Sequence, residues 1–275
     1  MTRVALFQST TGIDPEANAR LLVEAIEQAA AGGAAMLFTP EMSGLLDRNS
    51  ERARKNLRSE DEDSTLAACR EAARSHGMWV HLGSLAVLLE DGKVANRGFV
   101  IDREGQVRAR YDKIHLFDVD LPTGESWRES NVYSAGNGVV LINGTPVGKL
   151  GLTICYDLRF PGIFARLAEA DADVISVPAA FTVPTGKAHW HVLLRARAIE
   201  AGLFVVAAAQ VGRHEDGRQT FGHSLVVDPW GEILLDMGES QGIGFADIDL
   251  SRISDVRSRI PALNHRRPIP EAVSL

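Results

Sequence analysis

The stretch that decides the fold of this chain spans residues 150–161 and reads Leu-Gly-Leu-Thr-Ile-Cys-Tyr-Asp-Leu-Arg-Phe-Pro. Its first half is an apolar, β-branched run, which is typical of a buried strand. Cys155 stands where this strand ends, and Pro161 suits the first turn of a helix predicted over 162–172. Because α/β sheets keep their ligands at the carboxyl ends of strands, Cys155 lies at a candidate site.

The rest of the chain alternates strands with helices, as sheets covered by helices require. Asp14 and Pro15 open the first helix, and Gly32-Gly33 ends it. Further helices are expected at 49–58, 64–76, 187–201 and 251–258. Strands are expected at 4–8, 35–38, 79–89, 93–102, 107–111, 139–142, 146–154, 173–177, 204–210, 222–228, 232–236 and 242–247. We therefore expect one α/β domain over 1–275, with an extended tail from about residue 259.

Composition excludes several classes of protein. The 275 residues carry a net charge of -7, which argues against a nucleic-acid partner. The chain has two cysteines, Cys69 and Cys155, so a disulfide framework is not expected and a reducing cytoplasm is. No apolar run approaches the length of a membrane span, and the N-terminus enters a strand without room for a signal peptide. The sequence predicts a cytoplasmic protein without a membrane partner.

Charged residues come directly after two other predicted strands, just as Cys155 comes after the strand predicted at 146–154. Glu41 comes after the strand at 35–38, and Lys113 after the strand at 107–111. Because the ends of adjacent parallel strands converge at one edge of a sheet, we expect these side chains to meet there. Glu129 lies in a long segment, 116–137, that is expected to be an irregular and functional loop.

These residues stand in a recognisable pattern. Pro40-Glu41, Asp112–His115 and Ile154–Asp157 resemble the nitrilase superfamily of carbon–nitrogen hydrolases, as do the stretches 128–130, 188–200 and 222–231. The resemblance implies a four-layer α-β-β-α sandwich and dimers that pair through helical faces. It also implies a catalytic set, which carried over to this chain is Glu41, Lys113 and Cys155, with Glu129 as a second glutamate.

This set accounts for amide hydrolysis through a thioester. A free thiol is a weak nucleophile at neutral pH, and we expect Lys113 to lower the pKa of Cys155. We expect desolvation to raise the pKa of Glu41 toward neutrality, so that it serves as general base and then as general acid. Lys113 and the backbone N–H of Tyr156 would hold the oxyanion. The same set hydrolyses nitriles, so it does not select the substrate.

Finer features favour a keto-acid amide. Residues 205–214 and 222–224 resemble the amidases of deaminated glutathione, whereas ω-amidases acting on 2-oxoglutaramate are the alternative. Arg159, Phe181 and Thr185 match positions where ω-amidases hold the keto-acid end of the substrate. A guanidinium at 159 can grip a carboxylate bidentately, although a structural ion pair with Asp157 or with a distant acid is the competing interpretation. Arg213 or Arg218 would meet the carboxylate of a leaving dipeptide.

Two other classes of protein remain open. A metal-dependent amidohydrolase is disfavoured because His189 and His191 stand two apart on a helix, and His223 has no ligand spacing to them. We therefore expect no metal and no cofactor. A silent binding protein on the same fold is disfavoured by the intact catalytic set. One departure concerns specificity: members of the superfamily often carry glutamate after His-Trp, whereas this chain has His191.

Overall fold

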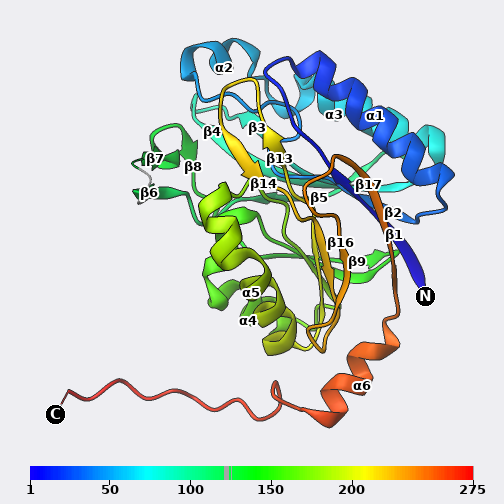
Figure 1. The fold of residues 1–275 in the computed structure, drawn as a ribbon, viewed down its shortest axis with the longest axis vertical. Coiled ribbons are helices and arrows are strands. Elements are labelled where there is room, and N and C mark those ends of the chain that lie inside the picture. Colours follow the sequence, from blue (N-terminus) through cyan, green and yellow to red (C-terminus); the bar gives the residue numbers. More distant parts are fainter. Residues whose placement is uncertain (121–123, 125, 275) are drawn as a thin grey trace.

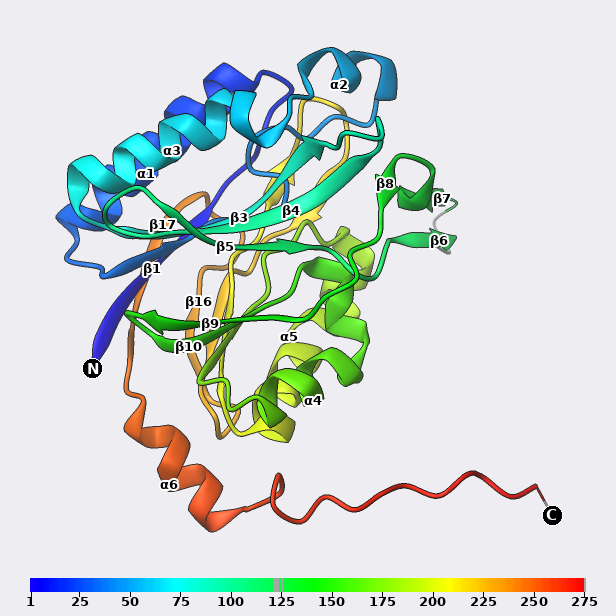
Figure 2. The same cartoon turned by 180° about the vertical axis from the view of Figure 1, so that it is seen from behind.

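Two β-sheets face each other between two outer layers of helices in the computed structural model, which describes residues 1–120, 124 and 126–274. Helices α1 (Pro15–Ala31) and α3 (Ser64–His76) cover one sheet, and α4 (Pro161–Glu169) and α5 (Val183–Ala201) cover the other, as Figures 1 and 2 show from opposite sides. The expected four-layer α-β-β-α sandwich is confirmed. Its main apolar core lies between the sheets and beneath α4 and α5, and a second lies beneath α1 and α3.

The first sheet has the strand order β17-β1-β2-β3-β4-β5, with β8 beside β4. Strands β1, β2 and β3 are parallel, and β17, β4 and β5 are antiparallel to their neighbours. The bounds are β1 Thr2–Gln8, β2 Met36–Phe38, β3 Trp79–Leu88, β4 Val94–Ile101, β5 Val107–Asp112, β8 Tyr133–Ser134 and β17 Gly242–Ile248.

The second sheet has the order β16-β15-β12-β11-β10-β9, with β10, β11 and β12 parallel. Its buried strands are short apolar runs, as expected where both faces are covered. The bounds are β9 Val140–Thr145, β10 Gly148–Leu152, β11 Val174–Ser176, β12 Phe204–Ala207, β15 Leu225–Val227 and β16 Ile233–Asp236. The remaining helices are α2 Ser50–Asn56 and α6 Ser251–Arg259, with one-turn 3-10 helices at Glu60–Glu62, Glu129–Asn131 (η2) and Cys155–Arg159 (η3).

Local signals in the sequence explain most helix ends. The Asp14 carboxylate accepts a hydrogen bond from the N–H of Glu16 at the start of α1, and Asp63 does the same for Leu66 at the start of α3. Helix α3 ends at Gly77, whose φ of 60° places it in the left-handed region that favours glycine. The bounds predicted for α3 are confirmed.

Three segments differ from the sequence-based expectation. Helix α5 begins at Val183 rather than at 187, because Pro184 fits the first turn of a helix. The segment 116–137 is not wholly irregular: β6 (Asp118–Asp120) and β7 (Ser126–Arg128) pair in it, and η2 and β8 follow; its residues 121–123 and 125 lie outside the described ones. A hairpin of β13 (Val211–Arg213) and β14 (Gln219–Phe221) follows β12, where a loop was expected.

The described residues after α6, 260–274, have no regular structure; Leu263 and Arg266 still contact the sandwich, and the residues beyond them extend away from it (Figures 1 and 2). Ile260 and Ile269 in this tail are largely exposed. No helix within the described part of the chain is both long and apolar enough to span a bilayer.

Candidate active site

Most residues singled out in the sequence line one cavity of about 600 Å³. Its wall includes the four expected catalytic residues, the expected oxyanion donor and the three residues expected to hold the keto-acid end of the substrate, namely Glu41, Lys113, Glu129 and Cys155, then Tyr156, then Arg159, Phe181 and Thr185. The structure therefore brings these eight residues together around one cavity.

The residues meet across the sandwich. Glu41 follows β2 and Lys113 follows β5, both in the first sheet, whereas Cys155 follows β10 in the second. The expectation that adjacent strands of one sheet deliver them is wrong. Two sheets that face each other bring their strand ends together at one end of the sandwich, so the site lies between the two layers.

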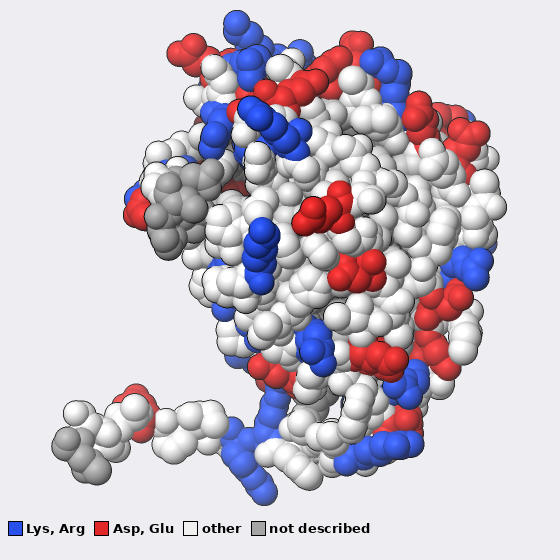
Figure 3. Space-filling view, viewed as in Figure 1, with Lys and Arg blue, Asp and Glu red and all other residues white. Residues whose placement is uncertain are grey.

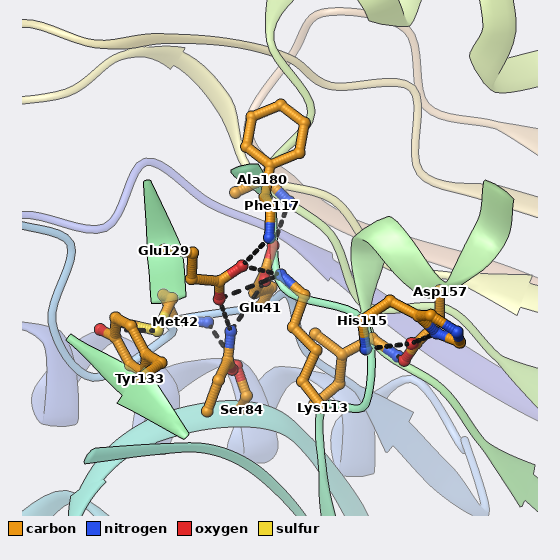
Figure 4. Close-up of polar contacts among 12 residues, drawn as sticks. Glu41, Met42, Ser84, Lys113, His115, Phe117, Glu129, Tyr133, Asp157 and Ala180 are labelled. Carbon is orange, nitrogen blue, oxygen red and sulfur yellow. Dashed lines mark hydrogen bonds and ion pairs between the residues drawn. The ribbon is translucent and has the colours of Figure 1, made fainter. Parts of the chain in front are cut away.

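Lys113 lies between the two glutamates (Figure 4). Its Nζ donates to Glu41 Oε1 at 2.9 Å and to Glu129 Oε2 and Oε1 at 2.9 and 3.1 Å. The backbone N–H of Phe117 donates to Glu129 Oε2 at 2.6 Å, and that of Ala180 donates to Glu41 Oε2 at 3.0 Å. Both carboxylates are thus fixed by a charged partner and by a backbone donor.

Asn96 on β4 completes this network, and sequence reasoning missed it. Its Nδ2 donates to Glu41 Oε1 at 3.0 Å and to Glu129 Oε1 at 3.1 Å. Its Oδ1 is buried and has no hydrogen-bond partner among the described residues. A polar side chain in the middle of an otherwise buried strand was the available signal, because buried amides are kept only where they are bonded. Asn96 holds the two carboxylates in a common orientation.

A sharp turn presents Cys155 to the cavity. Its φ is 48°, a left-handed conformation that is costly for a residue with a Cβ, by about 1–2 kcal/mol. The N–H of Cys155 donates to the carbonyl of Pro178 at 2.8 Å, which holds the turn against the second sheet. The 3-10 helix η3 begins at Cys155, so the N–H of Tyr156 lies next to the thiol-bearing residue.

Lys113 and desolvation act on the pKa values of Cys155 and Glu41 in the expected directions, but other contributions outweigh them, so both net shifts are opposite to the expectation. Burial raises the pKa of the Cys155 thiol well above its ordinary 9.0, the Glu41 carboxylate raises it further, and Lys113 lowers it by less. Burial alone would raise the pKa of Glu41, but the Lys113 ammonium and the hydrogen bonds that the carboxylate receives lower it below 4.5. Burial lowers the pKa of Lys113, but Glu129 and Glu41 together raise it well above 10.5. The resting site therefore holds a carboxylate, an ammonium and a neutral thiol.

The buried carboxylate of Asp157 joins the Lys113 segment to the Cys155 turn (Figure 4). Tyr111 Oη donates to Asp157 Oδ2 at 2.7 Å, and the N–H of Ile154 donates to the same oxygen at 2.8 Å. Oδ1 accepts from the N–H of His115 at 3.1 Å and from its ring Nδ1 at 2.7 Å. Asp157 is therefore not the partner of Arg159, as one interpretation of the sequence had it.

We expect Asp157→Ala to lower the free energy of unfolding by about 3 kcal/mol, because it leaves the Tyr111 hydroxyl and other buried donors without an acceptor. Urea titration followed by circular dichroism measures this change. Asp255→Ala is the control, since Asp255 pairs with Arg259 on the surface of α6 and should change stability by less than about 0.5 kcal/mol. Equal free energies of unfolding for the two variants would contradict the proposal that Asp157 joins the Lys113 segment to the Cys155 turn.

Arg159 projects over an aromatic part of the cavity wall. Its guanidinium lies 5.4 Å from the ring centre of Phe181 and 5.8 Å from that of Tyr156. Its Nη1 donates to the ring Nδ1 of His189 at 3.2 Å, and it has no carboxylate partner among the described residues. Thr185 instead bonds locally: its hydroxyl donates to the carbonyl of Thr182 at the start of α5.

A second group of cations lies around Trp127. The guanidiniums of Arg48 and Arg218 lie 4.9 and 5.1 Å from its ring centre, and all three residues line the cavity. The indole N–H of Trp127 is buried without a hydrogen-bond partner in the described part of the chain. Arg213, the alternative to Arg218 in the sequence, does not line the cavity.

Comparison with known proteins agrees with this geometry. Residues 3–258 match the carbon–nitrogen hydrolase family. The chain belongs to the carbon–nitrogen hydrolase family. It is 38% identical to the deaminated glutathione amidase of Yersinia enterocolitica, covering 98% of this chain and 94% of that protein, and 40% identical to that of Bos taurus, covering 96% and 82%.

The solved structures give the same result for the fold of this carbon–nitrogen hydrolase. The NitFhit protein of Caenorhabditis elegans superimposes with a TM-score of 0.89 at 38% identity, covering 97% of this chain and 65% of that one. The present chain thus spans about two thirds of NitFhit. Membership of the family makes the chain an enzyme that hydrolyses carbon–nitrogen bonds other than peptide bonds.

Potential metal ligands gather elsewhere. Among the described residues, His191, His223 and Asp236 bring ligand atoms within 4.8 Å of one another, and none of the three lines the cavity. The spacing argument considered His189 with His191 and gave His223 no ligand spacing, so it overlooked a cluster assembled from three segments of the chain.

Proposed function

We propose that the chain is a cysteine amidase that hydrolyses deaminated glutathione to 2-oxoglutarate and cysteinylglycine. One observation carries the proposal: Lys113 joins two carboxylates beside a buried thiol, in a cavity that has separate cationic groups on its wall. The names of the curated relatives support the choice of substrate.

Acylation begins from a neutral thiol. Glu41, which is charged at rest, takes the Cys155 proton as the sulfur attacks the amide carbon, so that the thiolate exists only during the attack. The oxygen of the tetrahedral intermediate is stabilised by the Lys113 ammonium and the N–H of Tyr156, at about 3 kcal/mol per donor. Glu41 then passes its proton to the leaving amine, the carbon–nitrogen bond breaks, and a thioester remains on Cys155.

Deacylation uses the same groups in reverse. Glu41 takes a proton from water as the water oxygen attacks the thioester carbon. The carbon–sulfur bond breaks, the sulfur recovers its proton from Glu41, and 2-oxoglutarate leaves. Glu129 keeps Lys113 in place through both steps, and Asn96 positions the two carboxylates relative to each other. No other group is required to move a proton.

The two ends of the substrate carry carboxylates, and the cavity offers a cation for each. Arg159 has donors available for the keto-acid carboxylate, and a guanidinium binds such a group bidentately. The carboxylate of the leaving dipeptide is placed by Arg48 and Arg218, with the unpartnered N–H of Trp127 as a further donor. Ammonia, the leaving group of 2-oxoglutaramate, has no carboxylate and would not bind to the cations around Trp127.

The ratio of kcat/KM for deaminated glutathione and for 2-oxoglutaramate tests the substrate. We expect deaminated glutathione to be hydrolysed more efficiently, because it alone engages the Trp127 end of the cavity. A tenfold preference for 2-oxoglutaramate, about 1.4 kcal/mol in transition-state free energy, would make the chain an ω-amidase instead. A nitrile panel run beside the amides checks that the amide is preferred.

Arg159→Ala should lower kcat/KM about 100-fold for both keto-acid amides, since it removes a charge-assisted contact common to them. Arg48→Ala should lower kcat/KM for deaminated glutathione but not for 2-oxoglutaramate. Steady-state assays of the two variants on the two substrates give this crossed pattern. Arg166→Ala, on the outer face of α4, is the matched control and should behave like wild type. An equal loss of kcat/KM on both substrates in Arg48→Ala would contradict a role for the cations around Trp127 in binding the leaving dipeptide.

We also propose that residues 1–275 act as one domain that assembles at least into a homodimer. Exposed apolar side chains at Val192, Ile199 and Trp230 lie on or beside α5. Figure 3 shows this face as mostly uncharged surface interrupted by separate acidic and basic side chains. Burying such a face against a second copy follows the usual two-fold arrangement.

Sedimentation equilibrium at micromolar concentration should give a mass of at least two chains. Ile199→Asp should shift the chain toward the monomer, because it places a charge in the proposed interface, whereas Leu21→Asp on α1 should not. A wild-type mass equal to one chain would exclude the dimer.

The proposed location is the cytoplasm, supported by two unpaired cysteines that a reducing compartment preserves. Fractionation of cells that express the chain, with immunodetection in each fraction, tests this. Recovery in a membrane or secreted fraction would contradict it.

A further inference from the structure

A cluster of two imidazoles and one carboxylate lies behind the cavity wall. His191 comes from α5, His223 from the turn before β15, and Asp236 from the end of β16. His191 Nε2 lies 3.0 Å from Asp236 Oδ2, and His223 Nδ1 lies 2.9 Å from Asp236 Oδ1. Three segments that are distant in sequence thus direct one ligand atom each to a common point.

The charge of the cluster is not balanced by a cation of the chain. The side-chain partners of Asp236 among the described residues are the two imidazoles alone, and its remaining bond is from the N–H of Gly238 at 2.9 Å. Hydrogen bonds from His191 and Gly238 contribute to a lowered pKa of Asp236 against the raising effect of burial. The Asp236 carboxylate, with no lysine or arginine partner among the described residues, offers its negative charge to a divalent cation.

Packing holds the two imidazoles in place. The ring of His223 stacks on Phe221 at 4.4 Å with an interplanar angle of 22°, and the rings of His191 and His223 meet edge to face at 5.1 Å. The N–H of Gly238 also orients the carboxylate. Ligands whose rotamers are fixed before the ion arrives lose little conformational entropy on binding it.

We propose that His191, His223 and Asp236 bind a zinc-class divalent cation that fastens α5 to β16. Two nitrogens and one oxygen suit Zn²⁺, and tetrahedral bonds of about 2.0–2.1 Å space the ligand atoms by about 3.4 Å. The observed ligand atoms lie within 4.8 Å of one another, so small rotations of the side chains produce this spacing. All three side chains are partly exposed, which leaves the fourth position for water.

The site is structural rather than catalytic. Phe221, which packs on His223, donates its backbone N–H to the carbonyl of Phe181 at 2.9 Å, and Phe181 lines the substrate cavity. The ion therefore lies one residue layer behind the wall and touches no reacting atom. The ion is expected to stabilise the packing of α5 against β14, at the part of the cavity wall that these two elements form.

Zinc titration of the full chain tests the site. The chain is first freed of metal with a chelator, and zinc binding is then measured by competition with a chromophoric zinc indicator. The titration is made in a Cys155→Ala background, because the thiol could bind zinc by itself. We expect one zinc per chain and a rise in Tm of about 5 °C at a hundredfold excess over the dissociation constant. X-ray absorption should show nitrogen and oxygen ligands without sulfur.

His191→Gln and Asp236→Asn should each weaken zinc binding about 100-fold, while His189→Gln, on the same helix, should leave it unchanged. Two variants are used so that a folding defect in one, detected by circular dichroism, leaves the other informative. Zinc binding that is absent, or that survives in both variants, would overturn the proposal. The titration does not depend on amidase activity, so it stands or fails apart from the proposed function.

Discussion

Cys155→Ala should abolish turnover of every amide, lowering kcat by at least about 10⁴-fold while the fold is retained. Among the described residues that line the cavity, Cys155 carries the only thiol, and a neighbouring carboxylate, Glu41, can take its proton; the other side chains at the centre are a second glutamate, a lysine and an amide. The van der Waals change is small, because the sulfur projects toward the cavity. Product release measured over hours with concentrated enzyme sets the limit on residual activity.

The second cysteine provides the matched control. Cys69 lies on α3 within the core beneath the first sheet, and burial raises its pKa to about 12. Cys69→Ala removes a thiol of the same chain without touching the cavity, so it should keep full activity and lose about 1 kcal/mol of stability. Full activity in Cys155→Ala, or lost activity in a folded Cys69→Ala, would refute the assignment of the nucleophile.

Glu41→Gln should lower kcat/KM by about 10³-fold or more, because Glu41 moves a proton in both half-reactions and an amide cannot accept one. Glutamine has one acceptor oxygen, so it keeps either the bond from Lys113 or the bond from the N–H of Ala180, which go to different oxygens of Glu41. The other core contacts are untouched, so the fold should persist. Stopped-flow measurement of amine release isolates the acylation step. Glu169→Gln, which alters a surface carboxylate on α4, is the control and should be silent.

The pH profile follows from the same groups. Glu41 must be charged to act as base, and its pKa lies below 4.5, so kcat/KM should stay level above about pH 5 and fall only under more acidic conditions. At the alkaline end, Lys113 keeps its charge beyond pH 10.5, because two carboxylates raise its pKa. A bell-shaped pH profile of kcat/KM whose acidic limb has its midpoint near pH 7 would contradict a Glu41 that is charged at rest.

Stability should depend on the same ionisation. Because the pKa of Glu41 is lower in the folded chain than in the unfolded one, its contribution to stability is present above the unfolded value and is lost as the pH falls through the folded value. Glu41→Gln should therefore lose both the acid limb of activity and the contribution of Glu41 to the acid loss of stability.

The family resemblance predicted the layers of the fold, and its motifs predicted part of the cavity wall but not Asn96, Arg48 or Trp127. Apolar runs and helix caps such as Asp14, Asp63 and Gly77 are local signals, so the elements that depend on them were placed within a few residues. The family motifs then identified residues from separate strands. Their spatial relation was not predictable from strand order alone, because Glu41 and Cys155 belong to facing sheets.

The ionisation of the site required the structure. Whether Lys113 or Glu41 dominates the pKa of Cys155 depends on burial and on distances of about 3 Å, neither of which a motif specifies. Asn96 and the cluster of His191, His223 and Asp236 were missed for a similar reason. Each is assembled by tertiary contacts between elements that carry no shared spacing in the sequence.

The most direct test of the account is acid-quenched mass spectrometry during the first turnover of a slowly hydrolysed amide. We expect the peptide that contains Cys155 to gain the mass of the acyl group as the amine is released, and to lose it as the acid appears. The peptide that contains Cys69 should stay unmodified. Release of both products with the Cys155 peptide unmodified at every time point would contradict a thioester mechanism.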